Sequence, residues 1–344
     1  MTSNTKHSRA EAARKRVKPL GIHTAVGHLQ KFSKWKDIPY LKDNFGRVPP
    51  FIISVGSRAR VFHSANLLNF REKAIVDVEA MDKFGIPYFG RVALLIGLAE
   101  SKAGTFPLMV AESQMGCPAA QINLRELLYY SNPEGYNASG NFYPSDSIYV
   151  VRAGTCGGVN SHGLSSPAMQ IGDVAIATES IGSVGAIFQS SFGMLSFSGI
   201  SPKPESGGAS FTPDGQHLLT SPSPQLVSFL ASSARESGIA SCCGPNFTKD
   251  SLYAEMGEDD FATLRDRYGV ISTEMEQIAI DLLARQFSDE GVPVNSGLIA
   301  AVIGAIPGKS FPETKEEHEA AAVAEENALV LAKESLGKIA AKFF

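Results

Sequence analysis

The sequence has few cysteines, no long apolar run and only a small excess of negative charge. Its 344 residues include four cysteines, of which Cys242 and Cys243 are adjacent, and it contains no Cys-x-x-Cys pair. This spacing argues against a disulfide framework and a zinc site, so we expect no metal and a reducing, cytoplasmic location. No apolar run approaches the ~20 residues that span a bilayer, which argues against a membrane protein. A net charge of -4 argues against a nucleic-acid partner.

Hydrophobic residues make up 44% of the chain, enough for a large core. Apolar, β-rich segments alternate with amphipathic ones, which predicts an α/β fold: a single three-layer α/β/α domain around a central mixed, mostly parallel sheet. We expect this domain to cover residues 21–344, with insertions near 131–146 and 190–224, where Ser, Gly, Pro and Asn accumulate. Residues 1–20 are rich in Lys and Arg. They indicate a flexible basic tail rather than an organelle transit peptide.

The segment 147–159, Ser-Ile-Tyr-Val-Val-Arg-Ala-Gly-Thr-Cys-Gly-Gly-Val, predicts a buried parallel strand that ends in a glycine-rich turn. Arg152, Thr155 and Cys156 would then lie beyond the carboxyl end of the strand, where open α/β sheets bind ligands. A guanidinium in this place needs a phosphate or carboxylate partner. The residues alone leave open whether that partner is a ligand or an internal glutamate. A dinucleotide-binding turn is less favoured, because residues 160–167 predict a loop rather than a helix.

Other strands are also followed by glycine turns. Residues 51–56 predict a strand whose turn leads into a helix carrying Arg58 and Arg60 near its start. Arginines there oppose the helix dipole, so a bound anion explains them better than a surface turn does. Residues 107–111 predict a strand, followed by a turn at 114–118 and a helix at 119–130, with Cys117 as a small buried residue. Further strands are expected at 172–177 and 297–306, and a long helix at 313–344.

Two glutamates precede the helix predicted after residue 276. Glu274 and Glu276 are two residues apart, so on a helix they would point in nearly opposite directions and could not act as a paired acid and base. A carboxylate can accept two hydroxyl donors, as binding of a sugar diol requires. The alternative, which the local sequence favours, is that acidic residues stabilise the start of a helix.

Taken in order, these segments resemble the nucleoside phosphorylase superfamily. The resemblance rests on Val-Gly-Ser-Arg-Ala-Arg at 55–60, Gln-Met-Gly-Cys-Pro at 114–118, Val-Arg-Ala-Gly-Thr-Cys-Gly-Gly at 151–158 and Glu-Met-Glu at 274–276. It covers Gly56 to about Phe344, apart from the insertions, and is greatest to the uridine phosphorylase branch. It implies an enzyme that cleaves the N-glycosidic bond of a nucleoside with inorganic phosphate, giving the free base and ribose 1-phosphate. Phosphate would be a co-substrate, and no cofactor is implied.

By this resemblance, phosphate would be bound by Gly56, Arg60, Arg152 and Thr155. The ribose would be held by Thr155, Met275 and Glu276, and the base would contact Cys156, Gly157 and Leu252. The site would be shared across a homodimer interface, with His28 reaching the ribose 5'-hydroxyl and Arg91 reaching phosphate. Arg152, Glu276 and Arg60 would be catalytic: the arginines place phosphate beneath C1' of an oxocarbenium-like transition state, and Glu276 orients the sugar.

The resemblance departs from the family pattern where the base is read. Uridine phosphorylases place a glutamine and an arginine after an Asp-x-Phe-Tyr segment; residues 249–253 match that segment, but Met256 and Glu258 stand at the two positions. The aspartate of the purine branch would fall near Ala305 or Ile306. Arg265, Arg267 or an unaligned glutamine are candidate replacements. We expect uridine as substrate; the alternatives are a purine or broad-specificity phosphorylase, a nucleosidase that uses water, and a non-catalytic nucleoside-binding protein.

Overall fold

The computed structural model describes residues 24–32, 34–44, 46–86, 92–131, 147–160, 169–182, 210–214, 217–249, 257–289, 292–306 and 311–343. The predicted basic tail, Arg91, Leu252 and Met256 lie outside the described residues. So do residues 132–146 of the first expected insertion and 190–209 of the second. Within the described ranges, no helix has the length and apolar character needed to cross a membrane.

The strands of the described residues belong to one sheet. They are β1 (Phe51–Val55), β2 (Phe70–Val76), β3 (Leu94–Ser101), β4 (Gly104–Glu112), β5 (Ile148–Val159), β6 (Val174–Gly182), β7 (Ser210–Phe211), β8 (Leu218–Thr220), β9 (Ser241–Thr248), β10 (Ser272–Glu274) and β11 (Val294–Ile306). Their order is β2-β3-β4-β1-β5-β10-β9-β6-β8-β7, and β11 pairs with both β5 and β6. The expected strands at 51–56, 107–111, 172–177 and 297–306 thus correspond to β1, β4, β6 and β11.

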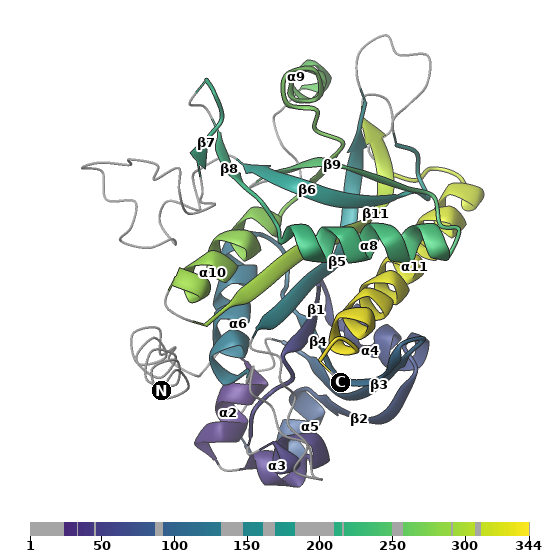
Figure 1. Ribbon diagram of the computed structural model, residues 1–344. Coiled ribbons are helices and arrows are strands. Elements are labelled where there is room, and N and C mark those ends of the chain that lie inside the picture. Colours follow the sequence, from purple (N-terminus) through teal and green to yellow (C-terminus); the bar gives the residue numbers. More distant parts are fainter. Residues whose placement is uncertain are drawn as a thin grey trace.

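One end of the sheet closes on itself. β5 pairs with β10, β10 with β9, β9 with β6, β6 with β11 and β11 with β5, so these strands form a ring. In Figure 1, β6 and β9 cross the upper ends of β5 and β11. The pairs β1–β4, β1–β5, β5–β11, β6–β9 and β9–β10 are parallel, and the others are antiparallel. The mixed α/β fold is confirmed, but the sheet is not mostly parallel, and a closed ring replaces part of the expected open, layered sheet.

Helices flank this sheet. They are α2 (Ala25–Lys31), the 3-10 helix η1 (Lys34–Asp37), α3 (Pro39–Asp43), α4 (Arg58–Leu67), α5 (Val78–Lys83), α6 (Cys117–Tyr130), α8 (Pro224–Glu236), α9 (Glu258–Tyr268), α10 (Gln277–Asp289) and α11 (Lys315–Ala340). Figure 1 shows α2, α3 and α5 at one end of the molecule and α9 at the other, beyond the ring. The helices expected at 119–130 and 313–344 are α6 and α11.

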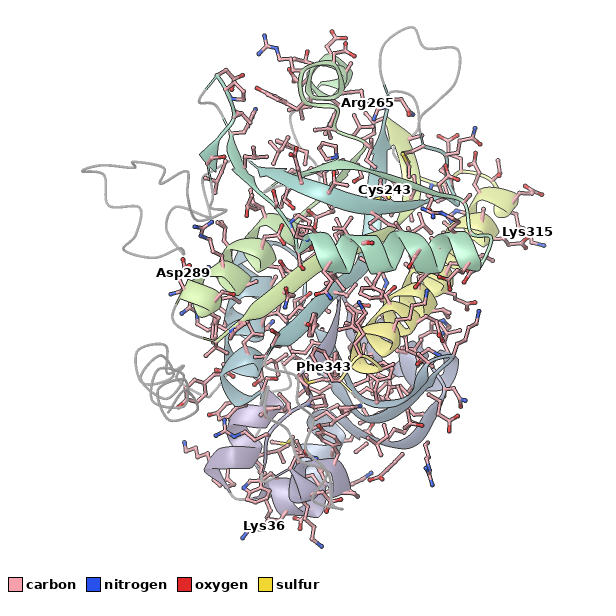
Figure 2. All side chains as sticks on the ribbon, in the orientation of Figure 1. Lys36, Cys243, Arg265, Asp289, Lys315 and Phe343 are labelled. Carbon is pink, nitrogen blue, oxygen red and sulfur yellow. The ribbon has the colours of Figure 1, made fainter. Side chains whose placement is uncertain are left out.

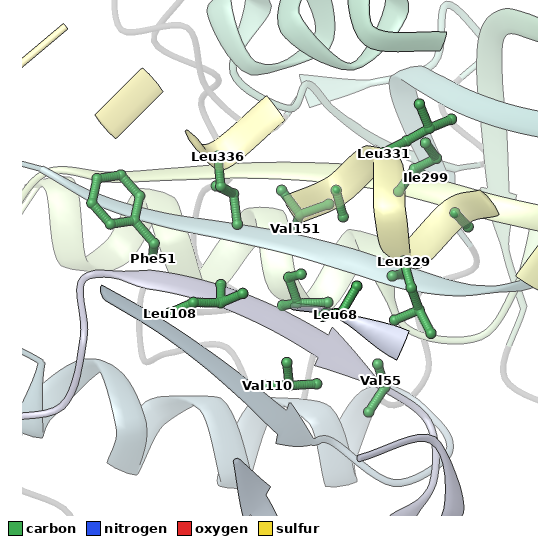
Figure 3. Packing of buried hydrophobic residues seen from close by; sticks show 14 of the residues in the cluster. Phe51, Val55, Leu68, Leu108, Val110, Val151, Ile299, Leu329, Leu331 and Leu336 are labelled. Carbon is green, nitrogen blue, oxygen red and sulfur yellow. The ribbon is translucent and has the colours of Figure 1, made fainter. Parts of the chain in front are cut away.

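Alternate residues of β1 and β5 enter two apolar clusters. Ile52, Ile148 and Val150 pack in a cluster with residues of α6 and α10. Phe51 and Val151 pack in a second cluster with residues of α4, α8 and α11, part of which is shown in Figure 3. Because successive side chains of a strand point to opposite faces, this alternation places helices on both faces of β1 and β5. The two strands that carry the candidate site are therefore fixed from both sides.

The predicted glycine turn after Arg152 is wrong, because β5 continues without interruption to Val159. Its glycines allow close packing instead. A Cβ atom on Gly158 would lie 2.6 Å from the Cβ of Met169, and one on Gly154 would lie 3.2 Å from Cζ of Arg152. Glycine is thus required here because neighbouring groups approach the strand closely, and Arg152 is a residue within a strand rather than beyond its end.

Candidate active site

Two arginines converge on the glycine that follows β1. Ser57 caps α4 by accepting a hydrogen bond from the Arg60 backbone N–H at 3.4 Å. A Cβ atom on Gly56 would lie 3.3 Å from Nη2 of Arg152 and 3.7 Å from Nη1 of Arg60. Arg60 uses its other nitrogens, Nε and Nη2, to bind both carboxylate oxygens of Glu325 on α11, at 3.0 and 2.9 Å. This pairing holds the Arg60 fork in place with Nη1 directed toward Gly56.

Arg152 is buried and only partly satisfied. It lies on β5 between Ser54 of β1 and Leu298 of β11, and 4% of its surface is exposed. Its Nη2 donates to Oε2 of Glu276 at 2.8 Å. Its Nε and Nη1 have no hydrogen-bond partner among the described residues. Leaving guanidinium donors buried without an acceptor is costly, so an anion that accepts from Arg152 beside Gly56 would be strongly favoured.

Glu276 connects the arginine to the start of α6. Its Oε1 accepts from the backbone N–H of Gly116 at 2.8 Å, and its Oε2 accepts from Arg152. Burial alone would raise the pKa of Glu276, but the Arg152 charge and these hydrogen bonds outweigh it, and the pKa is lowered. A carboxylate has about four acceptor positions, so roughly two stay open on Glu276 for further donors. The glutamate is therefore an ionised, fixed acceptor next to a buried cation.

Donors of the protein occupy the acceptor positions of the Glu274 carboxylate. Its Oε1 accepts from Nδ2 of Asn246 at 2.9 Å and from Oγ1 of Thr248 at 2.6 Å. Its Oε2 accepts from the backbone N–H groups of Glu276 and Gln277, at 2.7 and 2.8 Å. Burial, followed by repulsion from Glu276, raises the pKa of Glu274. The two glutamates thus have different environments, and the expectation that acidic residues stabilise the helix start holds for Glu274.

Comparison with known proteins decides the family. A family model described as the phosphorylase superfamily matches residues 73–336. The chain belongs to the phosphorylase superfamily. A comparison with curated protein sequences gave no significant match. The resemblance read from the strand-end motifs is confirmed at the level of the family.

Solved structures of nucleoside phosphorylases share the fold of this superfamily member. Purine nucleoside phosphorylase from Toxoplasma gondii, in complex with immucillin-H, is 20% identical with a TM-score of 0.57, over 86% of this chain and 93% of that one. Uridine phosphorylase from Vibrio fischeri is 16% identical with a TM-score of 0.57, over 87% and 96%. A Trypanosoma brucei nucleoside phosphorylase with uridine phosphorylase activity is 15% identical with a TM-score of 0.55, over 83% and 93%.

The remaining residues expected on β5 and β10 differ in what they offer a ligand. Thr155 and Gly157 are partly exposed on β5. Cys156 is buried, with its thiol packed in an apolar cluster and directed at the Ala300 carbonyl at 3.9 Å, and burial raises the pKa of the thiol. Its side chain therefore presents no polar group to a base. The half-buried Met275 accepts a hydrogen bond from Cys117 at its carbonyl, at 3.2 Å, which agrees with a structural role for that buried cysteine.

His28 lies in a different part of the phosphorylase chain. It is on α2, whose preceding residue Thr24 donates through its N–H and hydroxyl to Glu126 at 2.7 and 2.8 Å. Glu126 lies ten residues beyond Gly116 along α6, which corresponds to about 15 Å at a rise of about 1.5 Å per residue. Thr24, four residues before His28, is thus anchored about 15 Å along α6 from Gly116, whose N–H binds Glu276. Arg91 and Leu252 lie outside the described residues.

The two candidate base readers on α9 have other partners. Arg265, labelled in Figure 2, donates from Nη1 to the carbonyls of Gly269 and Val270, both at 3.4 Å, just past the end of the helix. Arg267 is more than half exposed and pairs with Asp214 at 3.5 Å. Sequence reasoning missed Asn246 and Thr248, whose side chains bind Glu274. Nothing in the sequence near 246–248 indicated that they would meet a residue 26 or 28 positions later.

Proposed function

We propose that this member of the superfamily is a phosphorylase of pyrimidine nucleosides that converts uridine and phosphate to uracil and ribose 1-phosphate. The observation that carries this proposal is the Arg152–Glu276 pair beside Gly56 and Arg60. Arg152 keeps two nitrogens, Nε and Nη1, and Glu276 keeps roughly two acceptor positions for ligands. Arg152 offers an anion-binding site, Glu276 offers an acceptor for a diol, and one hydrogen bond joins the two side chains. This arrangement suits a reaction between phosphate and a ribose ring.

The proposed reaction uses this arrangement. Phosphate binds at Gly56, Arg60, Arg152 and Thr155, and Glu276 accepts the ribose hydroxyls. As the C1'–N bond breaks, its electron pair leaves with the base, positive charge develops at the sugar, and a phosphate oxygen forms the new bond to C1'. Arg152 acts on both reactants, because it orients the phosphate and holds the Glu276 carboxylate that orients the ribose. The fixed anion also stabilises the oxocarbenium-like transition state.

One observation, together with the chemistry of uracil, supports a pyrimidine over a purine. Stabilising a departing purine at its N7 needs a nearby carboxyl group, and the end of β11, at Gly304, Ala305 and Ile306, carries none. A uracil needs only donors to its carbonyl oxygens and an acceptor for its ring N–H, which amides and water can supply. We further propose a cytoplasmic homodimer in which His28 and Arg91 of one subunit complete the site of the other. The anchoring of Thr24 on Glu126, about 15 Å along α6 from Gly116, is consistent with this sharing.

Base release tests the proposal. Purified protein is incubated with uridine, thymidine, inosine or adenosine, with and without inorganic phosphate, and the free base and ribose 1-phosphate are quantified. We expect uridine cleavage that depends on phosphate, with some tolerance for other pyrimidine nucleosides. Equal cleavage without phosphate would identify a nucleosidase, and a higher kcat/KM for inosine than for uridine would identify a purine phosphorylase. Uridine binding without any turnover would identify a nucleoside-binding protein.

A further inference from the structure

A buried ladder of polar side chains joins β9 to β10. The Ser272 hydroxyl donates to Oδ1 of Asn246 at 3.0 Å, and the Asn246 amide donates to Glu274. Thr248 donates to the same Glu274 oxygen. All four residues are at most 5% exposed. Burying a carboxylate without a cationic partner is unfavourable unless hydrogen bonds compensate for the lost water. The ladder must therefore keep its hydrogen bonds to Glu274.

The ladder ends on the first turn of α10. Glu274 accepts from the N–H groups of Glu276 and Gln277, and Oγ1 of Thr248 accepts from the N–H of Ile278 at 3.2 Å. The first N–H groups of a helix have no partner within the helix, so side chains that accept from them fix where the helix begins. The backbone of Glu276 is thereby tied to β9 and β10, while its side chain reaches Arg152.

We propose that Glu274 is a positioning residue, which acts with Thr248 and Asn246 to hold Glu276 where its carboxylate meets both Arg152 and the sugar. The four donors on Glu274 occupy the acceptor positions that a ribose diol would need, whereas Glu276 keeps roughly two of its own open. Glu274 therefore acts through Glu276 and does not touch the substrate. This inference rests on the proposed function, since it assigns Glu276 to the ribose.

Two variants of Glu274 separate positioning from direct chemistry. In Glu274→Gln, the side-chain carbonyl can accept from the N–H groups of residues 276 and 277. Its amide NH2 can donate to the Thr248 hydroxyl and, once the Asn246 side-chain amide flips, to Oδ1 of Asn246. The helix start is preserved without the negative charge. We expect Glu274→Gln to keep kcat/KM for uridine within about tenfold of wild type, and Glu274→Ala to lose about 100-fold, mostly in kcat. A Gln variant as inactive as the Ala variant would overturn the inference.

Thr248 provides a matched pair if Glu274→Ala does not fold. Thr248→Val keeps the shape but removes the donor to Glu274 and the acceptor for Ile278, whereas Thr248→Ser keeps both. We expect kcat to fall about tenfold or more in Thr248→Val and by less than about threefold in Thr248→Ser, with KM for phosphate nearly unchanged in both. Equal kcat values for the two variants would contradict the inference.

A readout without substrate separates this inference from the proposed function. Amide hydrogen exchange is measured on the intact protein and read from a proteolytic peptide that covers residues 275–280. Thr248→Val should exchange faster than wild type there, while Thr248→Ser should not, because only the former loses a cap of α10. Unchanged exchange in Thr248→Val would refute the positioning role even if the enzyme is active. Faster exchange in a protein without nucleoside turnover would uphold the helix anchoring and refute the proposed reaction instead.

Discussion

Asp281 allows the cost of a buried charge in this fold to be measured directly. It lies on α10 and is 2% exposed. Its Oδ1 accepts from Nε2 of Gln277 at 2.6 Å and the Ser296 hydroxyl at 2.7 Å, and its Oδ2 accepts from the Ser180 hydroxyl at 2.6 Å. All three donors are neutral. Burial raises the pKa of Asp281 from 3.8 to about 6, although these hydrogen bonds act in the opposite direction.

The sign of the effect follows from this shift. Because the folded-state pKa is above the unfolded one, the group contributes stability that is fully present below pH 3.8 and is lost as pH rises through about 6. A difference of about two units corresponds to about 3 kcal/mol at about 1.4 kcal/mol per unit. Asp281→Asn removes the titration and keeps the contacts: its carbonyl can accept from Gln277 and Ser296, and its amide can donate to Ser180, whose hydroxyl rotates.

Urea unfolding of wild type and Asp281→Asn between pH 4 and pH 7.5 measures the difference. Relative to wild type, we expect the free energy of unfolding of the variant to rise by about 2.5 kcal/mol from pH 4 to pH 7.5, slightly less than the full effect because unfolded Asp281 is already partly ionised at pH 4. Groups common to both proteins cancel. Asp289→Asn, a half-exposed aspartate on the same helix that is labelled in Figure 2, is the control and should follow wild type. A difference between Asp281→Asn and wild type that stays constant with pH would refute the reasoning.

Three further predictions concern catalysis. Arg152→Ala should lower kcat/KM for uridine by at least ~100-fold in steady-state assays, the scale of one lost transition-state partner, and a near-normal value would disprove its assignment. Gly56→Ala should raise KM for phosphate about tenfold, because its methyl group would sit 3.3 Å from Nη2 of Arg152 where the anion must approach; an unchanged KM would place phosphate elsewhere. Mixing His28→Ala with Arg152→Ala chains should restore some activity, since a hybrid dimer has one site free of both substitutions, and no recovery after confirmed subunit exchange would count against a shared site.

Local sequence patterns predicted the segments that carry the site. The continuous apolar run of β1 and the amphipathic run of α10 each appeared where expected. Arg152 was chosen because a guanidinium at the end of an apolar strand needs a partner, and the two partners considered were a ligand anion and an internal glutamate. In the structure Glu276 binds Nη2, while the nitrogens Nε and Nη1 have no partner among the described residues, so the glutamate does not exclude a ligand anion.

Features that depend on distant residues were not predictable in this way. Arg152 and Glu276 are 124 residues apart, and no local pattern indicates that they meet. β2 was missed because the exposed Arg71, Glu72 and Lys73 conceal its alternation, and β10 is too short for any periodicity. The closed ring was missed because β11 pairs with β5 and β6 at once, and strand pairing across such distances is set by the packing of the whole fold. The glycines of β5 indicated a turn, since a sequence does not distinguish a bend from close packing.

The ring of strands also determines when the fold can be completed during synthesis. β5 and β6 are made early, but the strand that joins them, β11, begins only at residue 294. Until it arrives, both have an unpaired edge, and an exposed edge can pair with other chains. Glu276 precedes β11, so every named ligand residue exists before the ring does. At that stage the nascent chain contains the ligand residues but lacks both the ring and Glu325, which holds Arg60. Folding then depends on contacts of long sequence separation, which form slowly.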